Sequence, residues 1–244
     1  MDFTIEEKTM NAWPALQTIL LDGWILRLAN GYTKRANSVN PIYSYDNNID
    51  EKINYCENIY KNNNLSVIFK IIDCDEYKIL DKKLETLNYE KIDLTSVQIC
   101  NEIKNVNISK YLIIENNFSI NWKNCLYNCC NIDNLETKET IENMLKNIKH
   151  EIICVYKMEE ENCIGCGYGV IEKGTIGLFD IIVKKEFRGN GYGKEIVETL
   201  LAKAMEKGIK EAHLSVVNDN IVAKALYEKL GFKEIYKYWY RKKD

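Results

Sequence analysis

Residues 188–194 read Arg-Gly-Asn-Gly-Tyr-Gly-Lys and separate an apolar run that ends at Val183 from a segment with apolar residues at helical spacing. Glycines adopt backbone conformations that other residues avoid, so several N–H groups can converge within such a stretch. The N-terminus of the following helix adds positive potential. The stretch therefore predicts a loop that binds a phosphate-like anion, and a glycine-rich turn without a ligand is the alternative.

Two better-known glycine loops fit this stretch less well. A P-loop has four residues between its first glycine and Gly-Lys and then Ser or Thr. Here three residues separate Gly189 from Gly193, and Glu195 follows Lys194. The dinucleotide fingerprint G-x-G-x-x-G belongs to a βαβ unit, whereas this spacing is G-x-G-x-G after predicted antiparallel strands. The sequence therefore disfavours both a P-loop and an NAD site.

Strand and helix signals alternate around the loop, from Glu151 to the C-terminal end of the chain. Apolar runs bounded by turn residues predict strands, and apolar residues three and four apart predict helices. The expected order is β-β-β-α-β-α-β, with strands at 152–157, 163–172 and 177–183, a helix across 196–204, a strand at 213–217, a helix at 221–230 and a strand at 235–241. This pattern predicts a mixed α/β fold.

The first half of the chain resembles a degenerate copy of the second. A strand at 65–72, a helix at 78–87 and a strand at 92–99 repeat the later order, and Leu87 aligns with Leu230 at an offset of 143 residues. The same offset places the glycine loop and one flanking residue on each side, 187–195, on residues 44–52, which contain no glycine. This half is therefore not expected to hold a phosphate there. Chance similarity between two short α/β units is the alternative.

Two motifs together identify a family resemblance. The pattern R-x-x-G-x-G is met by Arg188, Gly191 and Gly193. The pattern N-x-x-A-x-x-L-Y-x-x-x-G-F is met by Asn220, Ala223, Leu226, Tyr227, Gly231 and Phe232. In this order and spacing, the segment from about residue 150 to 241 resembles the GNAT superfamily of acyl-CoA N-acyltransferases. Residues 11–14 (Asn-Ala-Trp-Pro) and 22–24 (Asp-Gly-Trp) resemble stretches of its tandem, two-lobed members.

The resemblance implies a two-lobed mixed sheet, with a degenerate N-terminal lobe at 1–105 and a catalytic lobe at 106–244. It implies direct transfer of an acetyl group from acetyl-CoA to a primary amine, without a covalent enzyme intermediate. The cofactor would lie in a V-shaped opening between the strand that ends at Val183 and the strand that begins at His213. Its contacts would be the strand backbone of Ile181, Ile182 and Val183, the loop residues Arg188, Gly189, Asn190, Gly191, Tyr192, Gly193 and Lys194, and the side chain of Asn220.

The chemistry needs a base and an acid. A primary amine with a pKa of about 10 is protonated at neutral pH and must lose a proton before it attacks the thioester. Asp180 is the expected base, because a carboxylate within an apolar strand is otherwise costly to place. Asp180 could instead orient the amine or a backbone group, and Glu172 is a second candidate. Tyr227 matches the tyrosine that the superfamily uses to protonate the departing thiolate, and an aromatic residue on a buried helix face is the alternative.

The nine cysteines are expected to be reduced thiols in a cytoplasmic protein, because their number is odd and their spacing irregular. Cys163 and Cys166 form a C-x-x-C pair on a predicted strand, and no second pair of that spacing matches it. Cys125, Cys129 and Cys130 lie on a separate predicted helix. This spacing therefore predicts no metal ion. The co-substrate that the resemblance implies is acetyl-CoA.

The overall charge limits the partners. A net charge of -3 and a pI near 5.7 give no basic surface for nucleic acid or an anionic membrane, and they suit a basic amine. No run approaches the roughly 18 apolar residues of a membrane span. Arg27, Arg35 and Asn37, on strand-like runs, are expected to line the substrate side. A non-catalytic acyl-CoA sensor and a protein lysine or N-terminal acetyltransferase remain alternatives, and the acceptor, acyl length and oligomeric state stay open.

Overall fold

A computed structural model describes residues 3–43, 48–104, 106–160 and 162–244. The sequence also favours a connector between the two lobes at residues 105–109, of which Asn105 lies outside the described residues. The elements of the first half are α1 (Thr4–Ala12), β1 (Gln17–Leu21), β2 (Trp24–Leu28), the 3-10 helix η1 (Lys34–Ala36), β3 (Val39–Pro41), α2 (Ile49–Asn62), β4 (Val67–Ile72), η2 (Asp75–Tyr77), α3 (Lys78–Thr86) and β5 (Glu90–Cys100).

The second half confirms the predicted order of strands and helices. It contains β6 (Ile113–Glu115), α4 (Ile120–Cys130), α5 (Leu135–Lys146), β7 (Glu151–Glu159), β8 (Asn162–Glu172), β9 (Thr175–Val183), η3 (Lys185–Phe187), α6 (Tyr192–Glu206), β10 (Glu211–Val217), α7 (Ile221–Lys229) and β11 (Lys233–Lys243). The sequence pattern favours a helix at residues 138–146, but α5 begins earlier, because the Asn134 side chain accepts a hydrogen bond from the Thr137 N–H and caps the helix.

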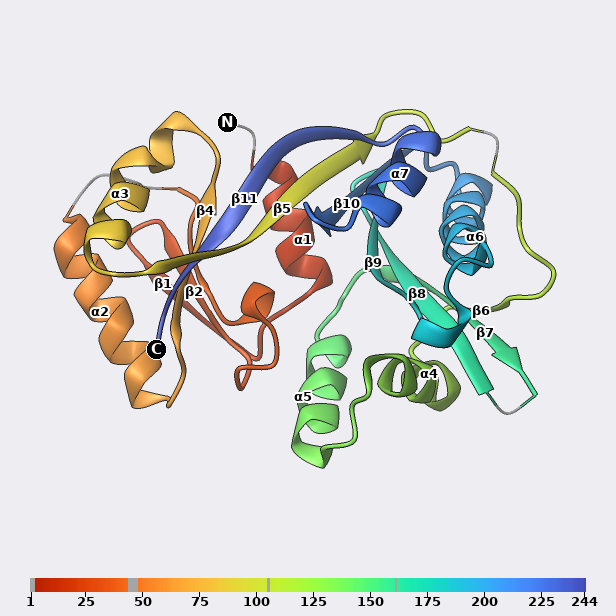
Figure 1. Cartoon of the computed structure of the whole chain (residues 1–244), viewed down its shortest axis with the longest axis horizontal. Helices are drawn as coiled ribbons and strands as arrows, with labels where there is room; N and C mark the ends of the chain where they lie inside the picture. Colours follow the sequence, from red (N-terminus) through yellow and green to blue (C-terminus); the bar gives the residue numbers. More distant parts are fainter. Residues whose placement is uncertain (1–2, 44–47, 105, 161) are drawn as a thin grey trace.

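All strands join one 11-stranded sheet in the order β1-β2-β3-β4-β11-β5-β10-β9-β8-β7-β6 (Figure 1). The C-terminal strand β11 lies in the middle, antiparallel to both β4 and β5. Strand β5 in turn pairs with β10 of the second half, where Ile99 faces His213. Each half therefore contributes its closing strand to the junction, and the two lobes share a continuous mixed sheet.

The internal repeat is visible in the element order. The series β1-β2-β3-α2-β4-α3-β5 has the same order as β7-β8-β9-α6-β10-α7-β11. The first residues of α2 and α6, Ile49 and Tyr192, are separated by the predicted offset of 143 residues. Before α6, Gly191 is left-handed with φ 84°, and Asn48 holds the same place before α2 with φ 53°. Asparagine tolerates this conformation, so the first half keeps the turn without the glycine.

Helices cover both faces of the second-half sheet. In β7, Ile153 and Val155 pack with α6 and α7, whereas Cys154 and Tyr156 pack with α4 and α5. Such alternation follows from the two-residue period of a strand. A third cluster fills the space between α2, α3 and the strands β4 and β11. Among the described residues, no helix has the length and apolar character of a membrane-spanning segment.

Candidate functional site

The parallel strands β9 and β10 separate after a short contact. They pair from Thr175 with Glu211 to Gly177 with His213 and no further, although β9 continues to Val183 and β10 to Val217. Beyond Gly177, the other edge of β9 is taken by β8, and the other edge of β10 by β5. Each strand thus keeps one edge free within a V-shaped opening. The geometry agrees with the opening expected from the sequence.

Asp180 lies at a break in the register of β9. Pairing with β8 shifts between Tyr168–Phe179 and Cys166–Ile182, which is a bulge, and Asp180 there has φ 47°. Its Oδ2 atom is buried without a hydrogen-bond partner among the described residues. Burial raises the pKa of Asp180 to about 6, although the Arg35 guanidinium acts in the opposite direction. A carboxylate with this pKa can exchange protons near neutral pH.

The first half supplies one of the three polar residues expected near the substrate. Arg35 lies on η1 and not on a strand, and its charge acts on Asp180. Burial would lower the pKa of Arg35, but the hydroxyls of Tyr238 and Tyr240 and the carboxylate of Asp180 raise it overall. Arg35 is therefore a cation at the junction of the two halves.

Arg27 and Asn37 have structural roles instead. Both are buried, and Arg27 donates to the carbonyl oxygens of Arg35 and Trp13. Asn37 follows η1 as its C-cap, and its Oδ1 accepts from the backbone N–H of Ala29 at 2.7 Å. These bonds satisfy backbone groups that the sequence pattern does not pair. Arg27 also lines a cavity of about 420 Å³, so the expected place of the two side chains on the substrate side stays a prediction.

The glycine loop presents a row of unpaired backbone donors. Gly189 and Gly191 have φ values of 86° and 84°, and a Cβ added at either would meet nothing within 4 Å. Helix α6 has no side-chain cap, and its first hydrogen bond runs from the Glu195 N–H to the Gly191 carbonyl. The N–H groups from Gly189 to Lys194 donate to no acceptor among the described residues. Such a cluster at a helix N-terminus is suited to an anion.

Side chains of the loop hold its shape. Arg188 Nε donates to the Val183 carbonyl at 3.0 Å, which ties the loop to the end of β9. Asn190 Nδ2 donates to the Phe187 carbonyl at 3.1 Å. Lys194 is exposed, and its Nζ lies 3.7 Å from the Glu198 carboxylate. The cation is thus available beside the backbone donors.

Helix α7 carries the two remaining predicted site residues. Asn220 caps the helix, since its Oδ1 accepts from the Ala223 N–H at 3.1 Å. Tyr227 is 7% exposed, and its ring meets Phe232 edge-on at 5.8 Å. Its hydroxyl has no hydrogen-bond partner among the described residues, and burial raises its pKa to about 12. Tyr227 is therefore protonated at neutral pH, as an acid must be.

Glu172 lies at the opposite end of β8 from the opening, where it pairs with Thr175. Its carboxylate accepts from Asn11 Nδ2 at 3.0 Å and lies 3.5 Å from His150 Nε2. This position disfavours Glu172 as the base.

His213 is 3% exposed at the apex of the opening, and both ring nitrogens lack partners among the described residues. Burial and the nearby Lys8 lower its pKa to about 4, so the ring is neutral.

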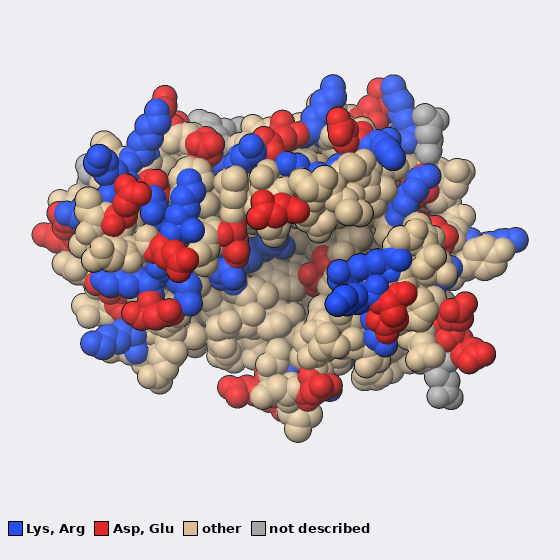
Figure 2. All heavy atoms as spheres, viewed as in Figure 1, with Lys and Arg blue, Asp and Glu red and all other residues tan. Residues whose placement is uncertain are grey.

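Space is available between the two halves. Figure 2 shows a hollow in the middle of one face, with acidic and basic side chains on its walls. A cavity of about 420 Å³ lies beside Asn11, Arg27 and His150, and another of about 440 Å³ lies beside Lys8 and His213. Neither of these two cavities is lined by the glycine loop. The loop is an open surface site.

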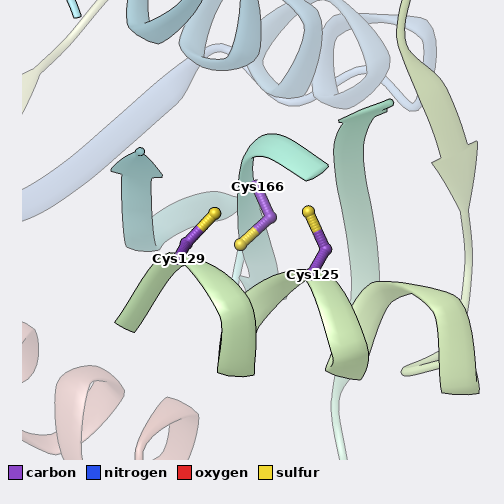
Figure 3. A group of neighbouring side chains, drawn as sticks. All are labelled: Cys125, Cys129 and Cys166. Atoms are coloured by element: carbon purple, nitrogen blue, oxygen red, sulfur yellow. The ribbon is translucent and has the colours of Figure 1, made fainter. Parts of the chain in front are cut away.

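Cysteines that are distant in sequence come together in the structure, which the sequence pattern did not predict. The sulfur atoms of Cys125, Cys129 and Cys166 all lie within 4.8 Å of one another (Figure 3). Cys125 and Cys163 form a disulfide, so the expectation that every cysteine is a free thiol was wrong for this pair. The missed signal was the spacing of Cys125 and Cys129, which places both on one face of a helix.

Comparisons with known proteins bear on the family of the chain. Residues 121–232 match the Acetyltransferase (GNAT) family, and residues 4–132 match the family described as probable histone acetyltransferase Rv0428c C-terminal. An uncharacterized N-acetyltransferase of Bacillus subtilis, YobR, is 28% identical across 97% of this chain and 96% of its own. A [ribosomal protein bS18]-alanine N-acetyltransferase of Haemophilus influenzae is 36% identical over 37% of this chain and 62% of its own.

Solved structures share the whole fold. A GCN5-related N-acetyltransferase from Sphaerobacter thermophilus has a TM-score of 0.65 at 12% identity and covers 97% of this chain and 84% of its own. A tandem GNAT protein from the clavulanic acid biosynthesis pathway has a TM-score of 0.62 at 8% identity, with coverage of 84% and 74%. The glycine loop and the separation of β9 from β10 agree with these matches. The chain therefore belongs to the GNAT superfamily and is an acyl-CoA-dependent N-acyltransferase with two lobes.

Proposed function

We propose that this protein transfers an acetyl group from acetyl-CoA directly to a primary amine. The observation that carries the proposal is the row of unpaired N–H groups from Gly189 to Lys194, at the uncapped end of α6 and next to the free edge of β9. A diphosphate bound to these donors would place the rest of the cofactor along β9. We further propose that residues 106–244 form the catalytic lobe and residues 1–105 the degenerate lobe.

The free edge of β9 suits the pantetheine arm. Ile181, Ile182 and Val183 lie on the stretch of β9 whose edge opposite β8 has no strand partner. An extended amide chain can pair with such an edge as an added strand does. On the opposite wall, the Asn220 side-chain amide remains free to donate to the cofactor, since only its oxygen is used by the cap.

Two groups balance the protons of the transfer. The ammonium of the acceptor loses a proton to Asp180, directly or through water, and the amine attacks the thioester carbonyl. The carbon–sulfur bond then breaks, and the Tyr227 hydroxyl gives its proton to the CoA thiolate. The nitrogen loses its second proton as the amide forms, which restores the Tyr227 hydroxyl, and the proton on Asp180 passes to solvent. Asp180 faces the junction with the first half, so we place the acceptor in the hollow between the halves.

A primary amine is also the acceptor that the relatives favour. One relative is named for the alanine nitrogen of ribosomal protein bS18, and a Bos taurus relative, 35% identical over 28% of this chain, is named thialysine N-epsilon-acetyltransferase. The net charge of -3 favours encounter with a cationic amine.

Calorimetry with acetyl-CoA, followed by a thiol-release assay over a panel of amines, tests the proposal. We expect acetyl-CoA to bind and free CoA to appear only when an accepted amine is present. Binding without thiol release from any small amine or from a lysate of protein acceptors would indicate a sensing module. Absence of binding by protein freed of carried-over ligand would overturn the proposal.

A further inference from the structure

Four cysteines from two elements meet beneath the opening. Cys125 and Cys129 project from one face of α4, one helical turn apart, and Cys166 projects toward them from β8 (Figure 3). Cys163, also on β8, is in bonding contact with Cys125, and its Sγ lies 3.6 Å from the Cys129 Sγ. The other two cysteines close to these in sequence or in the sheet, Cys130 and Cys154, are free thiols outside this group.

A bulge lets both cysteines of the strand face the helix. Residues three apart on a regular strand point to opposite faces. In β8 the register shifts, so that Lys157 pairs with Gly165 but Met158 pairs with Cys163. The extra residue turns the strand, and Cys163 and Cys166 both pack into the cluster formed with α4. The C-x-x-C segment is thereby shaped like a two-ligand knuckle.

The distances fit one small ion surrounded by sulfur. A tetrahedral zinc site with Zn–S bonds of about 2.3 Å separates its sulfurs by roughly 3.8 Å. The observed separations are 3.6 Å for Cys129 to Cys163 and up to 4.8 Å among Cys125, Cys129 and Cys166, and the bonded pair Cys125–Cys163 must separate after reduction to reach this range. Four thiolates without oxygen or imidazole ligands favour a soft or borderline cation.

The surroundings hold the cluster in place and leave one side of it accessible. The Trp122 indole donates to the Gly167 carbonyl at 3.1 Å and holds α4 against β8. Cys129 is half-buried, whereas Cys125, Cys163 and Cys166 are at most 3% exposed. An ion can therefore enter beside Cys129 and be enclosed.

We propose that Cys125, Cys129, Cys163 and Cys166, when all are reduced, bind one Zn²⁺ that fastens α4 to the β8–β9 hairpin. A phosphine reductant first converts the disulfide to two thiols, with one water consumed and one phosphine oxide formed. Four thiols then bind one Zn²⁺ and release four protons. Four protein ligands fill the tetrahedron, so the ion has a structural role and no open position for a substrate. The site revises the expectation of no metal and is independent of the proposed acetyl transfer.

Metal analysis of the full chain tests the site. Protein purified under a phosphine reductant, incubated with zinc and desalted, is expected to retain about one zinc per chain by mass spectrometry of the metal. Substitution with Co²⁺ should give the visible bands of tetrahedral cobalt and a thiolate-to-cobalt charge-transfer band in the near ultraviolet. This spectrum needs no variant, so it remains informative if a cysteine substitution prevents folding.

Matched variants separate the cluster from its neighbours. Cys129→Ser and Cys166→Ser should lower retained zinc at least tenfold, and Cys130→Ser, an exposed thiol adjacent in sequence to Cys129, should retain it. Three results would overturn the proposal: reduced wild-type protein that retains no zinc, octahedral cobalt spectra, or equal loss of zinc in Cys130→Ser. Re-formation of the Cys125–Cys163 disulfide in air by protein that binds no metal would identify a redox pair instead.

Discussion

Asp180 combines a left-handed backbone with a carboxylate oxygen that is buried and unpartnered among the described residues. Both features cost free energy, and such costs are concentrated at functional sites. We expect Asp180→Asn to lower kcat/KM about 100-fold or more, the usual contribution of a general base. The wild-type pH profile of kcat/KM should bend near pH 6, which is the pKa of Asp180, and the variant profile should lack that bend.

The same substitution should not destabilise the fold. Because the folded-state pKa of Asp180 is raised from 3.8 to about 6, the folded protein binds more protons than the unfolded chain between these values. Its contribution to stability is therefore present at low pH and lost as the pH rises through about 6. Thermal melting of Asp180→Asn at pH 7 should give a Tm equal to or above that of wild type. A large drop in Tm would show that Asp180 is a structural residue.

The Tyr227 hydroxyl has no hydrogen-bond partner among the described residues, so its removal should not weaken the fold. We expect Tyr227→Phe to reduce kcat about 100-fold, because the thiolate then leaves without a proton donor. Acetyl-CoA affinity by calorimetry and the Tm should both stay close to wild type. Unchanged acetyl transfer would assign Tyr227 to packing against Phe232 alone.

Single residues were predictable where their type conflicted with their surroundings. A carboxylate within the apolar run 178–182 is enough to single out Asp180 from the sequence. The bulge around it, and the approach of Arg35 from a distant segment, depend on tertiary packing that no local pattern encodes. The backbone partners of Arg27 and Asn37 were not predictable for the same reason, because they lie outside the strands that a local pattern defines.

At the scale of one element, a substitution in the turn before α6 can distinguish the effect of backbone strain from the loss of anion binding. At Gly191, with φ 84°, a residue that carries a Cβ costs about 1–2 kcal/mol in backbone strain, and relief of that strain would move the unpaired donors of the turn. Gly191→Ala should therefore weaken CoA binding about tenfold or more, but should leave the binding of pantetheine, which has no diphosphate, unchanged. Calorimetry with the two ligands measures both effects.

Gly174 provides the matched control. It has φ 77° in the β8–β9 turn, and a Cβ there also meets nothing within 4 Å. Gly174→Ala should cost similar stability and leave CoA affinity intact. Equal weakening of CoA binding in both variants would place the diphosphate elsewhere.

Most elements followed directly from their periodicity, but β8 shows where periodicity stops being sufficient. Strict alternation would make Cys163 and Cys166 face opposite sides of the strand. The bulge near Lys157 and Met158 removes that alternation and brings both sulfurs to α4. Bulges leave little trace in composition when the extra residue, here between Cys163 and Gly165, is itself apolar.

At the scale of the whole molecule, each half depends on the other, because the closing strand of each half pairs with strands of the other half. Strand β5 of the first half has both of its neighbours, β10 and β11, in the second half. We expect residues 1–105 and 106–244, expressed separately, to be insoluble or unfolded, because each would expose unpaired strand edges. Co-expression should recover a soluble complex by size-exclusion chromatography. A cooperative thermal transition of isolated 106–244 would contradict this dependence.

Three elements of the repeat in the first half, β4, α3 and β5, were readable from the sequence. Strands β1, β2 and β3, helix α2 and the position of β11 between β4 and β5 were not predicted. Local patterns define which segments become strands, whereas the choice of neighbour depends on which edges the rest of the chain leaves free.

The central position of β11 also bears on how the protein is made. Residues 233–243 leave the ribosome after every other strand of the 11-stranded sheet, yet they fill its middle. Until then the nascent chain has β4 and β5 without their shared neighbour, and both strands offer open edges to other chains. Termination before residue 233 should therefore produce a polypeptide that aggregates, and chaperone demand should be greatest just before β11 is made.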